Sequence, residues 1–130
     1  GNKEPRVAFL SATESILKSV PSSLEANILY EWCSKNINNA HFSGPLALDT
    51  LLSYNAAVTK GLQGNPVVGQ PDAIIVPDIV SGNVLFKSLV YLSGGCAAGL
   101  VLGAKVPLLL TSRADPPAAR LASIALATLI

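Results

Sequence analysis

Apolar and polar residues alternate along the chain in blocks that predict strands and helices in turn. Short apolar runs, bounded by proline, glycine or polar residues, predict four buried strands at 6–10, 73–76, 98–102 and 107–110. A further short strand is predicted at 40–44. Because helical patterns lie between these runs, we expect the four buried strands to lie side by side in one mainly parallel sheet with flanking helices, an α/β fold.

Apolar residues at helical spacing predict four helices. The first begins at Ser22 or Ser23 and ends within 36–39, and the others span 50–60, 83–93 and 116–130. Asp49 is expected to cap the second helix, and either Ser81 or Asn83 the third. Trp32 is expected to lie in the core.

Polar residues follow two of the predicted strands, at positions where an open parallel sheet binds ligands. Residues 81–83 follow the strand at 73–76, and residues 111–113 follow the last strand. Such loops lie at the carboxyl ends of strands, where helix N-termini direct positive partial charge toward anions. Gly82 is expected to allow a close backbone approach or a positive φ. We therefore predict the functional edge within residues 72–113.

Composition and charge narrow the classes of function. The 130 residues are 50% hydrophobic and 13% charged, so we expect a single domain over residues 1–130 with a substantial core. A net charge of +1 argues against nucleic acid or a membrane as a partner. Cys33 and Cys96 have neither paired spacing nor nearby histidines, so we expect two reduced, buried cysteines and no metal site. His41, the only histidine, is interpreted as structural.

The sequence also bears on the location of the protein and on whether the chain is part of a longer polypeptide. Its apolar runs fall far below the roughly 18 residues that a membrane span needs, and we expect a cytoplasmic location. The chain contains no Met and opens on Gly1, which suggests a piece of a longer polypeptide. The terminal helix 116–130 is apolar on nearly every side, so we expect it to be buried, either in this domain or against a missing partner domain.

Five stretches carry a recognisable pattern. They read Gly-Pro-Leu-Ala-Leu-Asp at 44–49, Val-Pro-Asp at 76–78, Ser-Gly-Asn-Val-Leu-Phe-Lys-Ser-Leu at 81–89, Gly-Ala-Lys-Val-Pro at 103–107 and Leu-Thr-Ser-Arg-Ala-Asp at 110–115. Together they resemble the phosphate acetyl/butyryltransferase family over nearly the whole chain. The last two stretches look nearer to the butyryl branch than to the acetyl branch.

The resemblance implies an isocitrate/isopropylmalate-dehydrogenase-like enzyme of two domains, with the active cleft between them and with this chain resembling the second half. Such an enzyme moves an acetyl or butyryl group between coenzyme A and inorganic phosphate, giving an acyl phosphate and free coenzyme A. Coenzyme A is then a substrate, no separate cofactor is expected, and a homodimer is the expected assembly. This fragment alone is expected to be inactive, because half of the cleft is absent.

Two other functions remain open at the level of sequence. The first is a noncatalytic module of the same fold that binds coenzyme A or phosphate. The second is a metal-dependent hydroxy-acid dehydrogenase, which is the weaker alternative because the paired aspartates that a divalent metal needs are not evident. Release of thiol from acetyl- or butyryl-coenzyme A on addition of phosphate distinguishes the transferase from the binding module.

The resemblance also implies site residues. Arg113 is expected to bind phosphate through its planar guanidinium, with a surface ion pair to Asp115 as the alternative. Asp115 is either the proton acceptor or the cap of the last helix, because Ala118 and Ala119 occupy the region where the acetyl branch carries its carboxylate. The predicted catalytic residues are Ser112, Arg113 and Asp115, and the predicted substrate-binding residues are Ser81, Gly82, Asn83 and Thr111.

Overall fold

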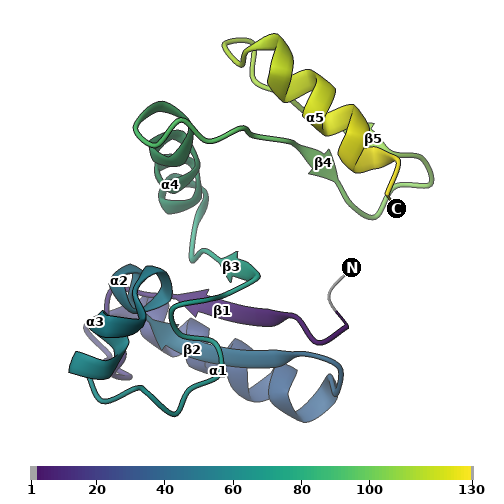
Figure 1. The fold of residues 1–130 in the computed structure, drawn as a ribbon. Helices are drawn as coiled ribbons and strands as arrows, with labels where there is room; N and C mark the ends of the chain where they lie inside the picture. Colours follow the sequence, from purple (N-terminus) through teal and green to yellow (C-terminus); the bar gives the residue numbers. More distant parts are fainter. Residues whose placement is uncertain (1–2, 130) are drawn as a thin grey trace. The chain divides into compact units, whose positions relative to one another are not determined.

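A computed structural model describes residues 3–129 of the chain (Figure 1). The chain divides into two compact units, residues 1–82 and residues 83–130. The composition predicts a single domain over residues 1–130, and each of the two units has its own sheet. Helix α4 (Ile79–Tyr91) begins in the first unit and continues into the second.

The first unit is a small parallel sheet with helices packed on it. Its elements are β1 (Arg6–Leu10), α1 (Pro21–Asn36), β2 (His41–Leu46), α2 (Leu48–Leu52), α3 (Tyr54–Thr59) and β3 (Ala73–Ile75). The strand order is β2-β1-β3, and Val7 of β1 lies opposite Phe42 on one side and Ala73 on the other. α1 packs against β1 and β2. The expected parallel pairing of the strands near Val7 and Ile74 is therefore confirmed.

The core of the first unit lies between the sheet and the short helices that follow β2. Its buried apolar residues are Ala8, Leu46, Leu51, Ala57, Val67 and Val68. The rings of Phe9 and Phe42 stack with centroids 6.2 Å apart. Gly44 allows β1 and β2 to approach closely, because a Cβ at this position would lie 2.6 Å from the Cβ of Phe9. Burial of these apolar residues is the main stabilising contribution in this unit.

The second unit consists of most of α4, two short strands and a C-terminal helix. After α4 come β4 (Leu100–Val101), β5 (Leu108–Leu109) and α5 (Pro117–Ala127). β4 and β5 pair in antiparallel orientation, with Leu100 opposite Leu109, and α5 packs on both strands. Gly103 has a φ of +91° in the connection between the strands, a conformation that side chains of L-residues disfavour. Proline begins α5 as expected.

The prediction of one sheet containing all four apolar strands is wrong. The strands near Val101 and Leu109 form a separate antiparallel pair rather than joining the parallel sheet. Only a short connection, 102–107, joins them, and a parallel pair requires a crossover of a dozen residues or more. The connection is therefore too short for the parallel pairing that the apolar pattern predicts.

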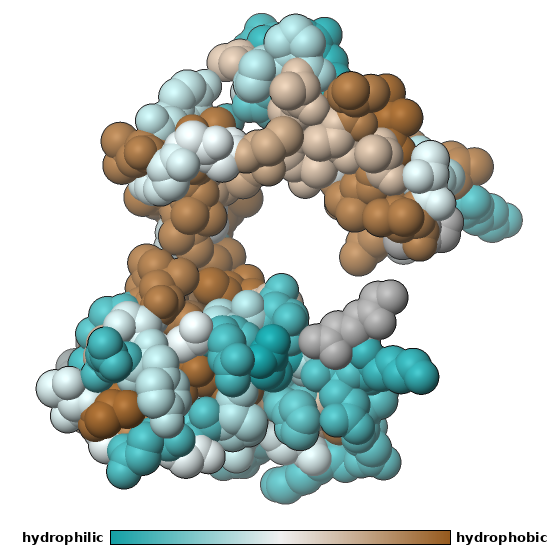
Figure 2. Space-filling model, viewed as in Figure 1, coloured by the Kyte–Doolittle hydropathy of each residue, from teal (hydrophilic) through white to brown (hydrophobic). Residues whose placement is uncertain are grey.

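Burial differs from expectation at several places. Trp32 is 59% exposed and does not lie in the core. Ile75 is 44% exposed because β3 is an edge strand, so the strand at 73–76 is not buried on both faces in this unit. Both cysteines are free as predicted, but Cys33 is only half-buried and Cys96 is exposed. The chain surface also carries many apolar side chains, which appear brown in Figure 2.

The predicted helix 50–60 is divided in two. Ser53 ends α2 and caps α3, accepting a hydrogen bond from the amide of Ala56. Asp49 lies inside the first turn of α2 rather than at its N-cap, where it accepts a hydrogen bond from the adjacent Thr50 amide and forms an ion pair with Lys60 at 3.0 Å. The serine side chain competes with the helical backbone for hydrogen bonds, which accounts for the break.

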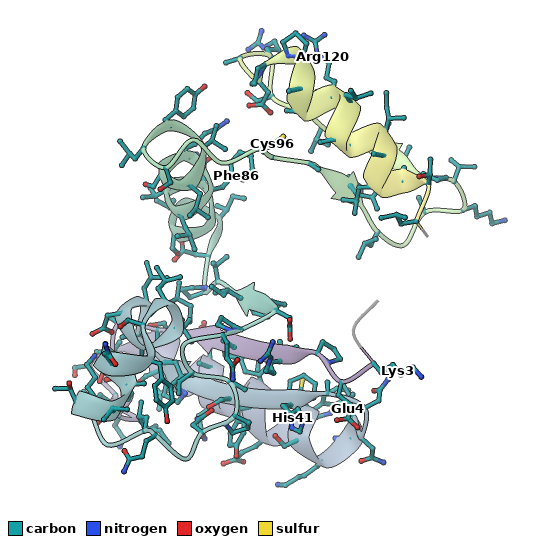
Figure 3. All side chains as sticks on the ribbon, viewed as in Figure 1. Lys3, Glu4, His41, Phe86, Cys96 and Arg120 are labelled. Carbon is teal, nitrogen blue, oxygen red and sulfur yellow. The ribbon has the colours of Figure 1, made fainter. Side chains whose placement is uncertain are left out.

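Within residues 3–129, none of the helices has the length and hydrophobicity needed to cross a membrane. The same residues contain no group of three His, Cys, Asp or Glu side chains arranged to hold a metal ion. His41 lies in the first unit with its Nε2 3.6 Å from Glu4 Oε2, and both side chains are labelled in Figure 3.

Candidate functional site

The second unit contains a cavity of about 380 Å³ between α4, the start of β4 and the loop that follows β5. It is lined by Asn83, Phe86, Lys87, Ala97, Gly99, Leu110, Thr111, Ser112 and Asp115. The lining combines a hydrophobic wall with five polar side chains. Four of the sequence-predicted site residues therefore gather here: Asn83, Thr111, Ser112 and Asp115.

α4 positions two of the polar side chains. Asn83 and Lys87 are four residues apart, so they lie on the same face of the helix, one turn from each other. Phe86, labelled in Figure 3, also lines the cavity, and the Lys87 ammonium lies 4.9 Å from the centre of its ring. Sequence analysis did not include Lys87 among the site residues. Its spacing from Asn83 was the signal that could have identified it.

The loop after β5 forms a tight turn at residues 112–115. The Asp115 amide donates to the Ser112 carbonyl at 3.1 Å, and the Ser112 amide donates back to Asp115 Oδ2 at 2.8 Å. The Ala114 amide donates to Ser112 Oγ at 3.4 Å. Asp115 is only 7% exposed. The turn that carries Ser112 is therefore fixed by hydrogen bonds to both the main chain and the side chain of Asp115.

Asp115 faces a cation from the other side of the cavity. The distance from Lys87 Nζ to Asp115 Oδ1 is 3.5 Å, and the side chains are 33% and 5% exposed, respectively. The prediction that Asp115 caps the last helix is wrong, because the N-cap of α5 is Pro116 and no side chain bonds there. The carboxylate turns inward because burial requires a partner for its charge, and Lys87 provides one.

Arg113 lies in the same turn but does not line the cavity. Its side chain is exposed, and within residues 3–129 it makes no ion pair or hydrogen bond. The expected alternative, a surface ion pair between Arg113 and Asp115, is wrong for the described residues because Asp115 pairs with Lys87. The guanidinium thus remains available one residue away from Ser112.

Ser81 and Gly82 belong to the first unit, and neither lines the cavity. The helix cap expected at Ser81 or Asn83 is provided by Asp78, whose Oδ1 accepts the amides of Val80 and Ser81 at 2.8 and 2.9 Å. Ser81 Oγ donates to Asp78 Oδ2 at 2.6 Å. The sequence predicts the cap three or five residues too late, since an Asp that follows Pro77 is also a favourable cap.

Gly82 allows a close approach rather than a positive φ. Its φ is not positive, and a Cβ at this position would lie 2.9 Å from Val76 Cγ2. The first of the two expectations for this glycine is therefore confirmed. The residue lets α4 start close to the strand segment that precedes it.

Asp78→Ala is expected to lower Tm by about 3 °C at pH 7, because the variant loses the cap of α4. The Ser81 hydroxyl, followed by the Ser81 amide, lowers the pKa of Asp78 from its ordinary value of 3.8. A lowered pKa contributes stability that is fully present above 3.8 and is lost as pH falls through the folded-state pKa. The difference in Tm between wild type and variant should therefore shrink below pH 4, roughly.

Thermal unfolding followed by circular dichroism between pH 7 and pH 3 checks this prediction. Asp78→Asn is the matched control, because its carbonyl oxygen still accepts the amides but does not titrate. If the difference in Tm between wild type and Asp78→Ala is the same at pH 3 and pH 7, the charge of Asp78 is not what stabilises the helix.

Comparisons with known proteins show which family the chain resembles. The family described as phosphate acetyl/butaryl transferase matches residues 1–128. A phosphate acetyltransferase from Rickettsia prowazekii is 46% identical over 99% of this chain and 37% of its own length. A phosphate butyryltransferase from Clostridium acetobutylicum is 40% identical over 100% of this chain and 43% of its own length. The expected closer similarity to the butyryl branch is thus not supported.

A solved structure of another protein is similar in fold to this chain. The branched-chain phosphotransacylase from Enterococcus faecalis aligns with a TM-score of 0.85 and 36% identity, covering 96% of this chain and 45% of that one. The chain therefore spans less than half the length of these relatives. The match of the family over residues 1–128 shows that the chain belongs to the phosphate acetyl/butaryl transferase family.

Proposed function

We propose that this chain is part of an acyltransferase that moves an acetyl or butyryl group between coenzyme A and inorganic phosphate. The observation that carries the proposal is the cavity of the second unit, in which Asn83, Lys87, Thr111 and Ser112 converge beside the turn that bears Arg113. Membership of the phosphate acetyl/butaryl transferase family supports the same reaction. Coenzyme A is a substrate here, and no separate cofactor is proposed.

The proposed chemistry needs donors for negative charge. A phosphate oxygen attacks the thioester carbonyl carbon and forms a carbon–oxygen bond, and the carbon–sulfur bond then breaks. The attacking hydrogen phosphate loses its proton and the leaving sulfur gains one, so the products are an acyl phosphate and a free thiol. The phosphate and the tetrahedral oxyanion are stabilised by hydrogen-bond donors that are already in position. Ser112 and Arg113 supply a hydroxyl and a guanidinium, Asn83 and Thr111 add neutral hydrogen-bonding groups, and the Lys87 ammonium faces Asp115. We keep Ser81 and Gly82 as residues at the start of α4 that support Asn83.

The cavity has the size of the reacting groups and not of the whole coenzyme A molecule. A volume of about 380 Å³ is at the lower end of the range for small-molecule sites, which is roughly 300–1,000 Å³. Phosphate and a short acyl thioester fit this volume, whereas the nucleotide part of coenzyme A needs further surface. We propose that the nucleotide part of coenzyme A binds to a surface outside the cavity.

We propose that the parts of the relatives that lie beyond this chain complete the enzyme. α5 exposes Leu121 and Ile124 at 69% and 51%, and Leu129, two residues beyond its end, is 80% exposed. A helix that is apolar on several sides is stable in water only when it is covered. The proposal includes an isocitrate/isopropylmalate-dehydrogenase-like enzyme of two domains, a homodimeric assembly in the cytoplasm, and poor turnover by residues 1–130 alone.

Thiol release tests the proposed function. The full-length protein is incubated with acetyl- or butyryl-coenzyme A, with and without inorganic phosphate, and free thiol is measured with a colorimetric reagent. Release that depends on phosphate, together with formation of acyl phosphate, is the expected result. Retention of coenzyme A without phosphate-dependent release would instead identify a noncatalytic binding module and overturn the proposal.

A further inference from the structure

Asp115 has the surroundings of a structural anchor. It is the one acidic residue among the buried residues of the described chain, 7% exposed, and each of its oxygens has a partner. Oδ2 accepts the Ser112 amide at 2.8 Å, and Oδ1 lies 3.5 Å from Lys87 Nζ. A proton acceptor needs an oxygen directed at the reacting atoms and free to take the proton. In Asp115, Oδ2 is engaged by the Ser112 amide and Oδ1 faces the Lys87 ammonium, so both oxygens take part in holding the turn.

Lys87 is held in place by its own neighbours. Its ammonium lies 4.9 Å from the ring centre of Phe86 and 5.9 Å from that of Tyr91, both on α4. This arrangement orients the lysine while it leaves the side chain 33% exposed at the cavity. The pair joins residues that are 28 positions apart, and it therefore links α4 to the turn after β5.

We infer that Lys87 and Asp115 are positioning residues that act as a unit, and that Asp115 is not the proton acceptor. This inference rests on the proposed function. The Lys87 ammonium compensates the buried carboxylate, and the carboxylate in turn holds the Ser112 amide. The turn of residues 112–115 is thereby kept in the one conformation that presents Ser112 and Arg113 to a bound phosphate.

The consequence of breaking the pair follows from its geometry. Loss of Lys87 leaves a buried carboxylate without its cation, and loss of the Asp115 charge leaves the ammonium without its partner. Either change lets the turn move, so that phosphate meets a less ordered site. Because positioning acts on the binding of phosphate, the effect falls on KM for phosphate more than on kcat.

The test uses the full-length protein and phosphate-dependent thiol release, with kcat, KM for phosphate and the pH profile measured for each variant. Asp115→Asn and Lys87→Met are each expected to raise KM for phosphate about tenfold and to change kcat by less than about threefold. The double variant is expected to resemble the single variants, because the two residues act as one unit. Lys87→Arg is expected to restore most of the affinity for phosphate. The shape of the pH profile should be unchanged in Asp115→Asn.

Lys35→Met is the matched control, since it removes one exposed lysine from α1. Circular dichroism verifies that each variant is folded, and Asp115→Asn and Lys87→Arg remain informative if Lys87→Met does not fold. A fall in kcat of about 10²–10⁴ in Asp115→Asn, with loss of one limb of the pH profile, would identify Asp115 as the base and overturn the inference. Effects that multiply in the double variant would also overturn it.

Failure of the proposed function would have a different signature. If the unsubstituted full-length protein released no thiol on addition of phosphate, the transferase assignment would fall, and the positioning role with it. The unsubstituted protein could instead be active while Asp115→Asn loses kcat and one limb of the pH profile, or while the effects of the single variants multiply in the double variant. In that case only the positioning role is refuted.

Discussion

Arg113→Ala is expected to reduce phosphate-dependent thiol release by about 10²–10⁴-fold in the full-length protein. Each charge-assisted hydrogen bond contributes about 1.5–3 kcal/mol, and the planar guanidinium can form two such bonds to one phosphate. The exposed Arg113 side chain makes no ion pair within residues 3–129, because Asp115 is occupied by Lys87. The side chain is therefore free to bind an anion next to Ser112.

Arg113→Lys is expected to recover only part of the lost activity. The ammonium keeps the positive charge but cannot present two parallel N–H groups to a phosphate. The free energy of unfolding should change by less than about 0.5 kcal/mol in both variants, because the side chain is exposed. A loss of activity without a loss of stability is the pattern that identifies a binding residue.

Steady-state kinetics with varied phosphate, together with urea unfolding, measure both quantities. Arg120→Ala is the matched control, because Arg120 is also exposed and also lies in the second unit, on α5. We expect its kinetics to equal those of the unsubstituted protein. Unchanged kinetics in Arg113→Ala would remove Arg113 from the site.

Gly99→Ala is expected to destabilise the second unit by about 3 kcal/mol or more. A Cβ at this position would overlap the main-chain carbonyl oxygen of Leu110, which has no flexible end that could move aside. The Gly99 carbonyl also accepts the Leu110 amide at 3.3 Å, and its amide donates to Ser123 Oγ at 2.9 Å. The substitution therefore separates β5 from β4 and β4 from α5.

The cavity should be affected by the same change, because Gly99 and Leu110 both line it. Urea unfolding and thiol release are measured on the same protein samples. Gly64→Ala is the control, since its φ is not positive and a Cβ there would meet nothing within 4 Å. A free energy of unfolding for Gly99→Ala within about 0.5 kcal/mol of the control would show that the strands can relax around the new methyl group.

Several features could be predicted from the sequence because they depend on neighbouring residues. Gly61 follows α3 with a φ of +77°, as expected for a glycine that ends a helix. Pro117 begins α5, where a proline amide is not needed, whereas α1 begins at Pro21, before the predicted start at Ser22 or Ser23. The parallel strands β1 and β3 follow from long connections that contain helices. Propensity and chain connectivity determine all of these.

Other features are predicted wrongly because one local pattern of residues is compatible with more than one structure. The pattern at 98–110 is apolar enough for two buried strands, but the connection is too short for a parallel pair. Apolar spacing placed Trp32 in a core, yet it is 59% exposed, since periodicity gives the faces of a helix and not what covers them. The sequence around Asp78 offered several capping residues, and hydrogen-bond geometry selected one of them.

The sequence by itself therefore determined the family, the parallel sheet of the first unit and the polar loop at 111–115. Only the tertiary structure decided how that loop is held. Lys87 and Asp115 are 28 residues apart, and no local pattern predicts that they meet at 3.5 Å. The physical reason is that burial of the carboxylate makes its charge costly unless a cation lies nearby, and that cation comes from a distant helix.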